Sequence, residues 1–145
     1  MTGRQEDQQV SLRIVVVNPP AGVRFALQRG KDELLEPGSA KGDLIFEFPI
    51  RVRNDGAEGS PNFLGPFAQG PRDARFVYVN SGTMAGEPAS PWTRRAKIPL
   101  GGITWAMIEK AKAGSMIEAK IAGTGRDGGP ACATVPLLDR GWKLQ

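Results

Sequence analysis

The sequence predicts a mainly β fold, a sandwich or open barrel of about seven strands with one short helix near residues 104–113. Two observations support this prediction. Apolar and polar residues alternate in several short segments, and 19 Gly and 12 Pro supply frequent turns between them. Only one segment carries the signals of a helix start and end. We expect residues 1–9 to be disordered and residues 10–142 to form a single β domain.

Three strand segments are expected in the first half, at residues 10–17, 23–28 and 43–53. The first is rich in β-branched residues and ends where two prolines follow Asn18. The third has the clearest period of two in the chain and therefore predicts one core face. Pro49 has no N–H to donate, so this strand is expected to be an edge strand or to bend there.

Four more strands are expected at residues 75–80, 92–99, 116–122 and 131–137. Alternation places Tyr78 and Phe76 on one face of the first of these. In the second it places Arg94 on the face that carries the apolar residues, and Arg95 and Lys97 on the other face.

The helix is predicted from its ends. Thr104 is the expected N-cap and Gly114 the residue that ends the helix. Ile103 and Ile108 have the spacing of a hydrophobic staple. The long connection from residue 99 to residue 116 also permits a parallel crossover, which leaves an α+β arrangement open.

Composition excludes several kinds of site. The chain has no His and a single cysteine, Cys132, which excludes His/Cys zinc sites and every His-based catalytic arrangement. We therefore predict no catalytic residue, metal or cofactor. The polar N-terminal segment and the lack of a long apolar run lead us to expect a cytoplasmic protein with no membrane partner.

Charge is unevenly distributed. Residues 1–70 hold 8 Lys/Arg and 9 Asp/Glu, a net −1, and residues 71–145 hold 11 and 6, a net +5. A basic half can attract anionic partners. Because no dense Lys/Arg run is present, the pattern does not favour nucleic-acid binding.

Five residues are candidates for an anion-binding face: Arg75, Arg94, Arg95, Lys97 and Tyr78. A guanidinium group matches the oxygens of carboxylate and phosphate, and Tyr combines an aromatic ring with a polar end. The alternative is structural: Arg95 and Lys97 would lie on a solvated strand face, and Arg94 would form an ion pair with Asp73, Glu47 or Asp127.

Several other features have simpler explanations. Trp92, Trp105 and Trp142 could line a pocket or fill the core, and Trp142 could instead be an exposed contact. The segment GTGRDGGP at residues 123–130 lacks the ending of a phosphate-binding loop, so it predicts a turn. Cys132 is expected to be a small buried apolar residue.

The runs GPFAQGPRDARFVYVNSG, WTRRAKIPL and RDGGPACATVP resemble the pattern of a small bacterial domain family that is known only as a family of unknown function. The resemblance spans Val10 to Trp142, and its most specific parts are RFVYVN and RRAKIPL. It implies a stand-alone bacterial domain. It implies no activity, substrate or site residue.

Three functions remain open on the sequence alone. The first is a non-enzymatic binding module that recognises a small anionic ligand or a protein partner. The second is a histidine-free enzyme in which Asp127, Asp73 or Glu47 would act with Arg and Tyr78. The third is homodimerisation through an edge strand such as residues 43–53.

Overall fold

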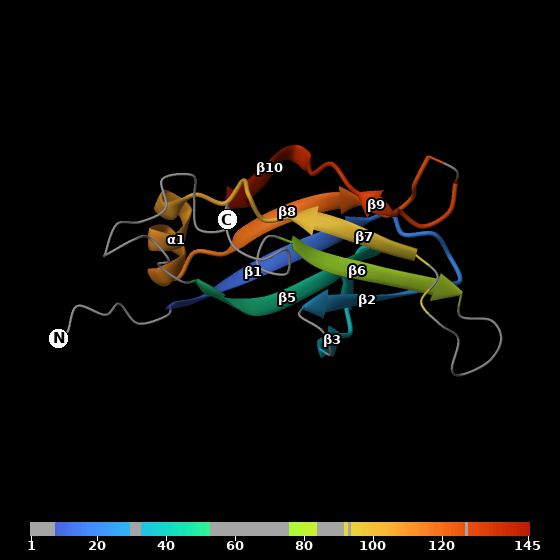
Figure 1. The fold of residues 1–145 in the computed structure, drawn as a ribbon, viewed down its shortest axis with the longest axis horizontal. Coiled ribbons are helices and arrows are strands. Elements are labelled where there is room, and N and C mark those ends of the chain that lie inside the picture. The colour runs from blue at the N-terminus through green and yellow to red at the C-terminus, as the bar shows by residue number, and fades with distance from the viewer. Residues whose placement is uncertain (1–7, 30–32, 53–75, 84–91, 93, 127) are drawn as a thin grey trace.

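The computed structural model describes residues 8–29, 33–52, 76–83, 92, 94–126 and 128–145 (Figure 1). The described strands form two sheets. The first sheet has the strand order β10 (Leu138–Leu144), β8 (Ile117–Ala122), β1 (Gln8–Val17), β5 (Asp43–Val52), β4 (Gly38–Ala40). The second has the order β3 (Glu33–Leu35), β2 (Val23–Arg29), β6 (Phe76–Thr83), β7 (Arg94–Pro99), β9 (Ala133–Thr134).

Most neighbouring strands are antiparallel, but β1 pairs with β8 in parallel, and so does β7 with β9. The segment that contains α1 (Trp105–Lys112) leads from β7 of the second sheet to β8 of the first, so the chain connects the parallel strands β7 and β9 through α1 and β8. The described strands form two stacked sheets and no closed barrel, which confirms the predicted mainly β sandwich with one short helix.

A single hydrophobic core lies between the sheets. The inner-face residues of β1, β5 and β8 pack against those of β2, β6 and β7. Large side chains that are fully buried there include Leu12, Ile14, Phe46, Leu27, Ile98 and Ile121. Alternation along β5 is confirmed, because Phe46 and Phe48 are buried and the intervening Glu47 is exposed.

The helix begins and ends as expected. The hydroxyl of Thr104 accepts a hydrogen bond from the Met107 backbone N–H, and Gly114 follows the C-cap with a positive φ of 114°. Ile103 and Ile108 are fully buried, as a hydrophobic staple requires. Figure 1 shows α1 at one end of the sandwich, away from the turn between β8 and β9.

The structure contains more strands than the seven expected. No strand was expected between residues 28 and 43, but β3 and β4 lie within this range because they pair with β2 and β5. Conversely, the strand expected at residues 131–137 is reduced to the two residues of β9. The C-terminal segment forms β10, which pairs with β8.

Pro49 lies in the half of β5 that β4 does not reach, since β4 pairs only with residues 43–45. On the other side Pro49 is opposite Ser11 of β1. Residues 1–7 of the expected disordered start lie outside the described residues, and β1 begins at Gln8. None of the helices in the described part of the chain has the length and apolar character needed to cross a membrane.

Two buried residues anchor the C-terminal third of the chain. Gly123 is buried where β8 ends, and its backbone N–H donates to the carbonyl of Val17 at 2.8 Å. Trp142 is also buried, and its indole N–H donates to the carbonyl of Pro99 at 3.0 Å. Trp142 is therefore a core residue that ties β10 to the end of β7.

Candidate functional site

The outer face of the second sheet carries the most distinctive polar cluster of the described chain. Strand register brings its members together: Tyr78 of β6 is opposite both Gln28 of β2 and Lys97 of β7, and Asn80 is opposite Arg95. All five side chains lie on the face away from the core, because Val77, Val79 and Ala96 occupy the inner face. We call these five residues, together with Phe76, the cationic face.

Arg95 is held in place from three sides. Its Nε donates to Oδ1 of Asn80 at 3.2 Å, and one terminal nitrogen donates to Oε1 of Gln28 at 3.2 Å. Asn80 Nδ2 also donates to Oε1 of Gln28, at 2.7 Å, so that the two amides are linked. The guanidinium carbon lies 4.9 Å from the centre of the Tyr78 ring, within the range of a cation–π contact.

The positive charge of Arg95 is not neutralised by these contacts. Both acceptors are neutral amide oxygens, and among the described residues Arg95 forms no ion pair. A guanidinium has five N–H groups, of which the two hydrogen bonds use two. The fixed side chain thus keeps both charge and donors for another group.

Lys97 adds a second positive charge on the same face. Its Nζ lies 5.6 Å from the centre of the Phe76 ring, and within the described ranges it has no carboxylate partner. Arg95 and Lys97 are two positions apart in β7, which puts their Cα atoms about 7 Å apart along the strand. The pair can therefore contact one dianion or two linked anionic groups.

Arg24 is a third cation on this sheet, and it differs from Arg95 and Lys97 in having a described anionic partner. Arg24 lies 5.0 Å from the centre of the Trp92 ring and forms an ion pair with Glu36 at 3.5 Å. At least half of each charged side chain is exposed, so the pair is weak, but it places a negative charge beside Arg24. Arg24 is thus less suited than Arg95 to receive an anion.

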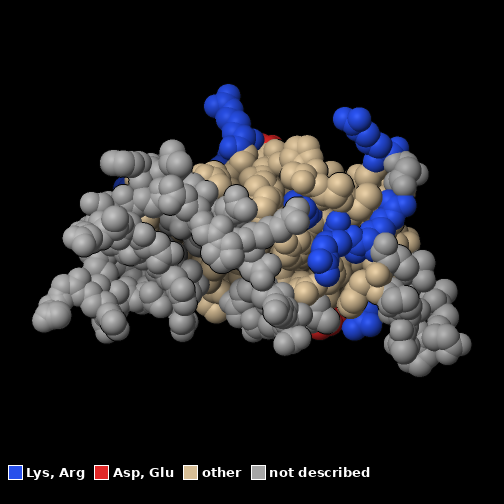
Figure 2. Space-filling view, in the orientation of Figure 1, with Lys and Arg blue, Asp and Glu red and all other residues tan. Residues whose placement is uncertain are grey.

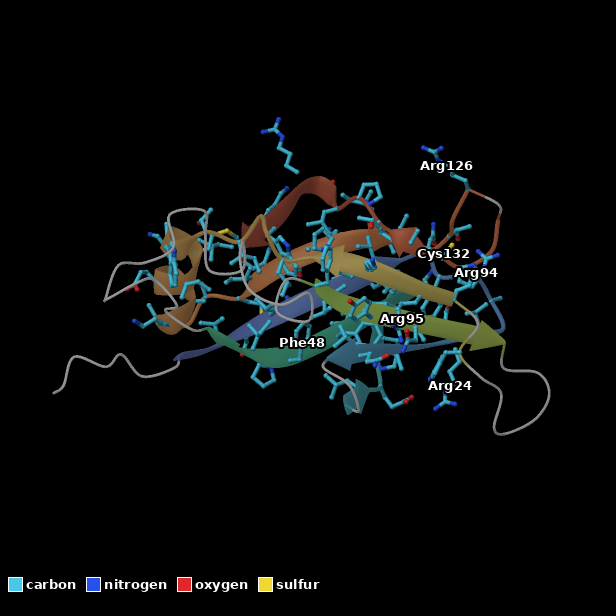
Figure 3. All side chains as sticks on the ribbon, in the orientation of Figure 1. Arg24, Phe48, Arg94, Arg95, Arg126 and Cys132 are labelled. Atoms are coloured by element: carbon cyan, nitrogen blue, oxygen red, sulfur yellow. The ribbon has the colours of Figure 1, made fainter. Side chains whose placement is uncertain are left out.

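Figure 2 shows Lys and Arg side chains gathered over the part of the molecule where β6 and β7 lie in Figure 1. Figure 3 places Arg95 over these strands. Arg94, by contrast, lies toward the end of the sandwich, beside Cys132.

Arg94 does not belong to the cationic face. Its NH1 donates to the carbonyl of Pro130 at 2.7 Å, and its guanidinium packs so closely on Gly129 that a Cβ added there would lie 2.9 Å from it. The alternation correctly put Arg94 on the opposite strand face from Arg95. However, β7 begins at Arg94, so its side chain packs on the turn at the end of the core instead of entering the core.

Of the five candidate residues, the structure brings together Arg95, Lys97 and Tyr78. Arg75 lies outside the described residues. Two residues of the cluster, Gln28 and Asn80, were not candidates. Alternation put Gln28 on a face with Arg24, and Asn80 on a face with Tyr78. Their contact with Arg95 depends on the pairing of β2 with β6 and of β6 with β7.

Glu47, one of the carboxylates considered for an enzyme, does not lie on this face. Glu47 lies on the outer face of the first sheet. There Arg13 forms an ion pair with Glu47 at 2.7 Å and a second ion pair with Glu118 at 3.1 Å. The hydrogen bond with Glu47, and then that with Glu118, raise the pKa of Arg13 above its ordinary value. Asp73 and Asp127 lie outside the described residues. No group of three potential metal ligands occurs in the described ranges.

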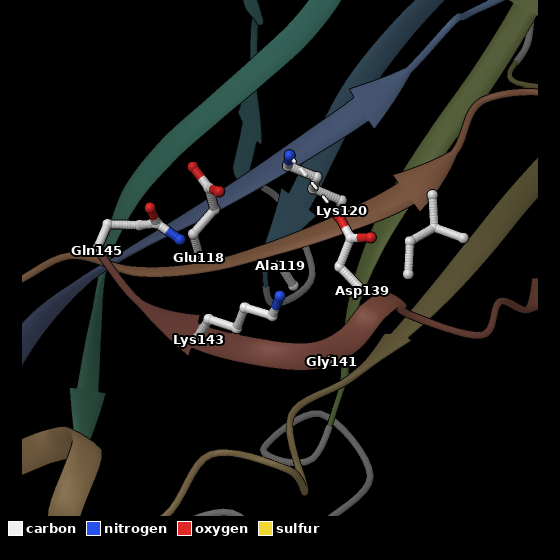
Figure 4. A pocket seen from close by; sticks show the side chains of 8 residues that line it. Glu118, Ala119, Lys120, Asp139, Gly141, Lys143 and Gln145 are labelled. Carbon is white, nitrogen blue, oxygen red and sulfur yellow. Dashed lines mark ion pairs between the residues drawn. The ribbon is translucent and has the colours of Figure 1, made fainter.

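A small pocket of about 90 Å³ lies between β8 and β10 (Figure 4). Most of its charged residues already have an ion-pair partner. Lys120 is 3.7 Å from Asp139, and Glu118 is paired with Arg13. The pocket therefore offers less uncompensated charge than the cationic face.

A model described as a family of unknown function (DUF5990) matches residues 10–145. The chain belongs to this family. The DUF5990 match confirms the resemblance predicted over Val10 to Trp142, and it names no activity. Neither the curated proteins nor the solved structures contain a match to the chain.

Proposed function

We propose that this DUF5990 protein is a non-enzymatic binding module that takes a small anionic ligand on the cationic face. The proposal is based on the contacts and the charge of Arg95. Two neutral amides and an aromatic ring fix its guanidinium while its charge stays uncompensated among the described residues. A fixed donor loses little side-chain entropy on binding, which favours affinity.

The ligand chemistry follows from the two cations. Guanidinium N–H groups bind carboxylate and phosphate oxygens with charge-assisted hydrogen bonds, and Lys97 contributes a second charge from a position whose Cα lies about 7 Å along the strand. A diphosphate or a dicarboxylate can reach both. We propose ligands of this class, and with them a cytoplasmic location, where a free exposed thiol such as Cys132 is also stable.

Calorimetric titration with inorganic phosphate, pyrophosphate and citrate tests the proposal. We expect pyrophosphate and citrate to bind wild-type protein with saturation, and Arg95→Gln to weaken binding at least tenfold, which equals about 1.4 kcal/mol. Gln keeps polar contacts with the amides but removes the charge. Lys97→Gln should weaken binding less, because this side chain is not held by hydrogen bonds.

Arg24→Gln is the matched control. It removes the same charge from the same sheet, but from a residue already paired with Glu36, so binding should change less than twofold. Equal losses in Arg24→Gln and Arg95→Gln would show a general effect of net charge and refute a site at Arg95. No saturable binding of any of the three anions by wild-type protein would refute the small-anion function.

A further inference from the structure

A second surface, separate from the cationic face, has the character of a ligand site. It is a groove of about 580 Å³ at the end of the sandwich, next to the turn that joins β8 to β9. The volume lies within the range of small-molecule sites. Its wall contains Ala122, Val135, Pro136 and Leu138, with Arg126 and Cys132 also lining it.

The groove combines an apolar wall with one cation. Arg126 is exposed and comes from the turn, and within the described part of the chain it has no carboxylate partner. None of the described lining residues is Asp or Glu. Figure 3 shows Arg126 on the turn and Cys132 below it, where the chain leads into β9.

Backbone hydrogen bonds hold the segments on both sides of the groove. The turn is held by the hydrogen bond from Gly125 N–H to the Gly129 carbonyl at 2.6 Å, and by that from Ala131 N–H to the Gly123 carbonyl at 3.1 Å. On the other side, the Val135 N–H donates to the carbonyl of Lys97 at 3.2 Å. Both walls are thus fixed by backbone contacts.

We propose that this groove binds an amphipathic carboxylate, a molecule with an alkyl chain and one anionic head. The alkyl chain would cover Val135, Pro136 and Leu138, and the carboxylate would meet the Arg126 guanidinium. Charge complementarity selects the head group, because the groove offers a cation and no described anion. Apolar burial selects the chain, and each methylene that leaves water should tighten binding about three- to fourfold.

Cys132 provides a direct reporter of occupancy. It is the only cysteine in the chain, its side chain is exposed, and it lines the groove. The expected burial of Cys132 was therefore wrong, because the chain at this point runs along the groove. A ligand in the groove should shield its thiol from a small neutral reagent such as iodoacetamide.

The test measures the alkylation rate of Cys132 by mass spectrometry in the full chain, with hexanoate, octanoate or decanoate below their micellar concentrations. We expect each acid to slow alkylation with saturation, and the half-protecting concentration to fall about three- to fourfold for each buried methylene. Decanol has the same chain length as decanoate but no charge. Its half-protecting concentration should be at least fivefold higher than that of decanoate.

Two variants locate the head group. Arg126→Gln should raise the half-protecting concentration of decanoate at least fivefold and leave that of decanol unchanged. Lys110→Gln, which removes an exposed cation from α1, should behave as wild type. The proposal is overturned if decanoate does not protect Cys132, or if decanol protects equally well. Should Arg126→Gln fail to fold, the comparison of decanoate with decanol on wild-type protein still decides the question.

Discussion

Among the described glycines, Gly123 is the one where an added Cβ would lie closest to other backbone atoms, and we expect its replacement by Ala to destabilise the fold. A Cβ built at this position would lie 2.7 Å from Pro19 Cα, 2.9 Å from Pro19 N and 2.9 Å from the Val17 carbonyl oxygen. Carbon atoms in ordinary contact are about 3.5–4.0 Å apart. Because all three obstacles are backbone atoms, no side-chain rotation can relieve the contact.

The expected cost combines several effects. Overpacking of this kind costs about 1–3 kcal/mol. Moving Gly123 away would also stretch its hydrogen bond to Val17, worth about 1 kcal/mol. The lower entropy of unfolded Ala offsets about 0.4–1 kcal/mol. The net loss should be about 2 kcal/mol, or a fall in Tm of about 6 °C for a chain of this size.

Guanidinium chloride denaturation followed by tryptophan fluorescence measures the loss. Gly101→Ala is the matched control, since a Cβ at Gly101 would meet nothing within 4 Å and its φ is not in the left-handed region. We expect Gly101→Ala to be as stable as wild type or slightly more stable. If the two variants unfold at the same denaturant concentration, the close approach of Gly123 to the Pro19 turn is not a constraint on stability.

Two more changes test the C-terminal third of the chain. Trp142→Phe keeps most of the buried ring but removes the hydrogen bond to Pro99, and should lower the free energy of unfolding by about 1–2 kcal/mol in the same denaturation assay; an unchanged midpoint would contradict this. Ala133→Gly should raise that free energy by about 0.5–1 kcal/mol, because Ala133 has a φ of 63°, where only Gly is free of strain. A less stable Ala133→Gly protein would show that the conformation carries no cost.

Strand faces could be predicted wherever one side of a strand is buried. In β8 the apolar set of Ile117, Ala119 and Ile121 is buried as alternation requires, while Glu118 and Lys120 are half-buried. The helix was equally clear, because its cap residues act locally. Such features depend on neighbours in the sequence, and the sequence shows those directly.

Short strands and strand pairing were not predictable in the same way. The three residues of β4 are strand only because β5 lies beside them. In β10, Asp139, Arg140 and Gly141 all have positive φ, which interrupts the register with β8 and hides the alternation. Alternation along the sequence does not reveal such a break in strand pairing.

The candidate site was predictable only in part, because alternation predicts the face of each strand but not which strands lie side by side. Alternation in β7 put Arg95 and Lys97 on one outward face, and alternation in β6 put Tyr78 with Phe76. The order of β2, β6 and β7 was needed to bring these faces together with Gln28 and Asn80. Arg94 lies on the strand face that alternation predicted, but alternation does not show that β7 begins there or that the side chain packs on Gly129 and Pro130.

The position of β1 has a consequence for how the chain folds during synthesis. The first strand lies between β5 and β8, and its contact with β8 joins residues 105 positions apart, as in the Arg13–Glu118 pair. At ribosomal rates of about 5–20 residues per second, β1 waits about 5–20 s for that neighbour. During this time one hydrogen-bonding edge of β1 lacks its native strand, so nascent chains are most exposed to aggregation before β8 emerges.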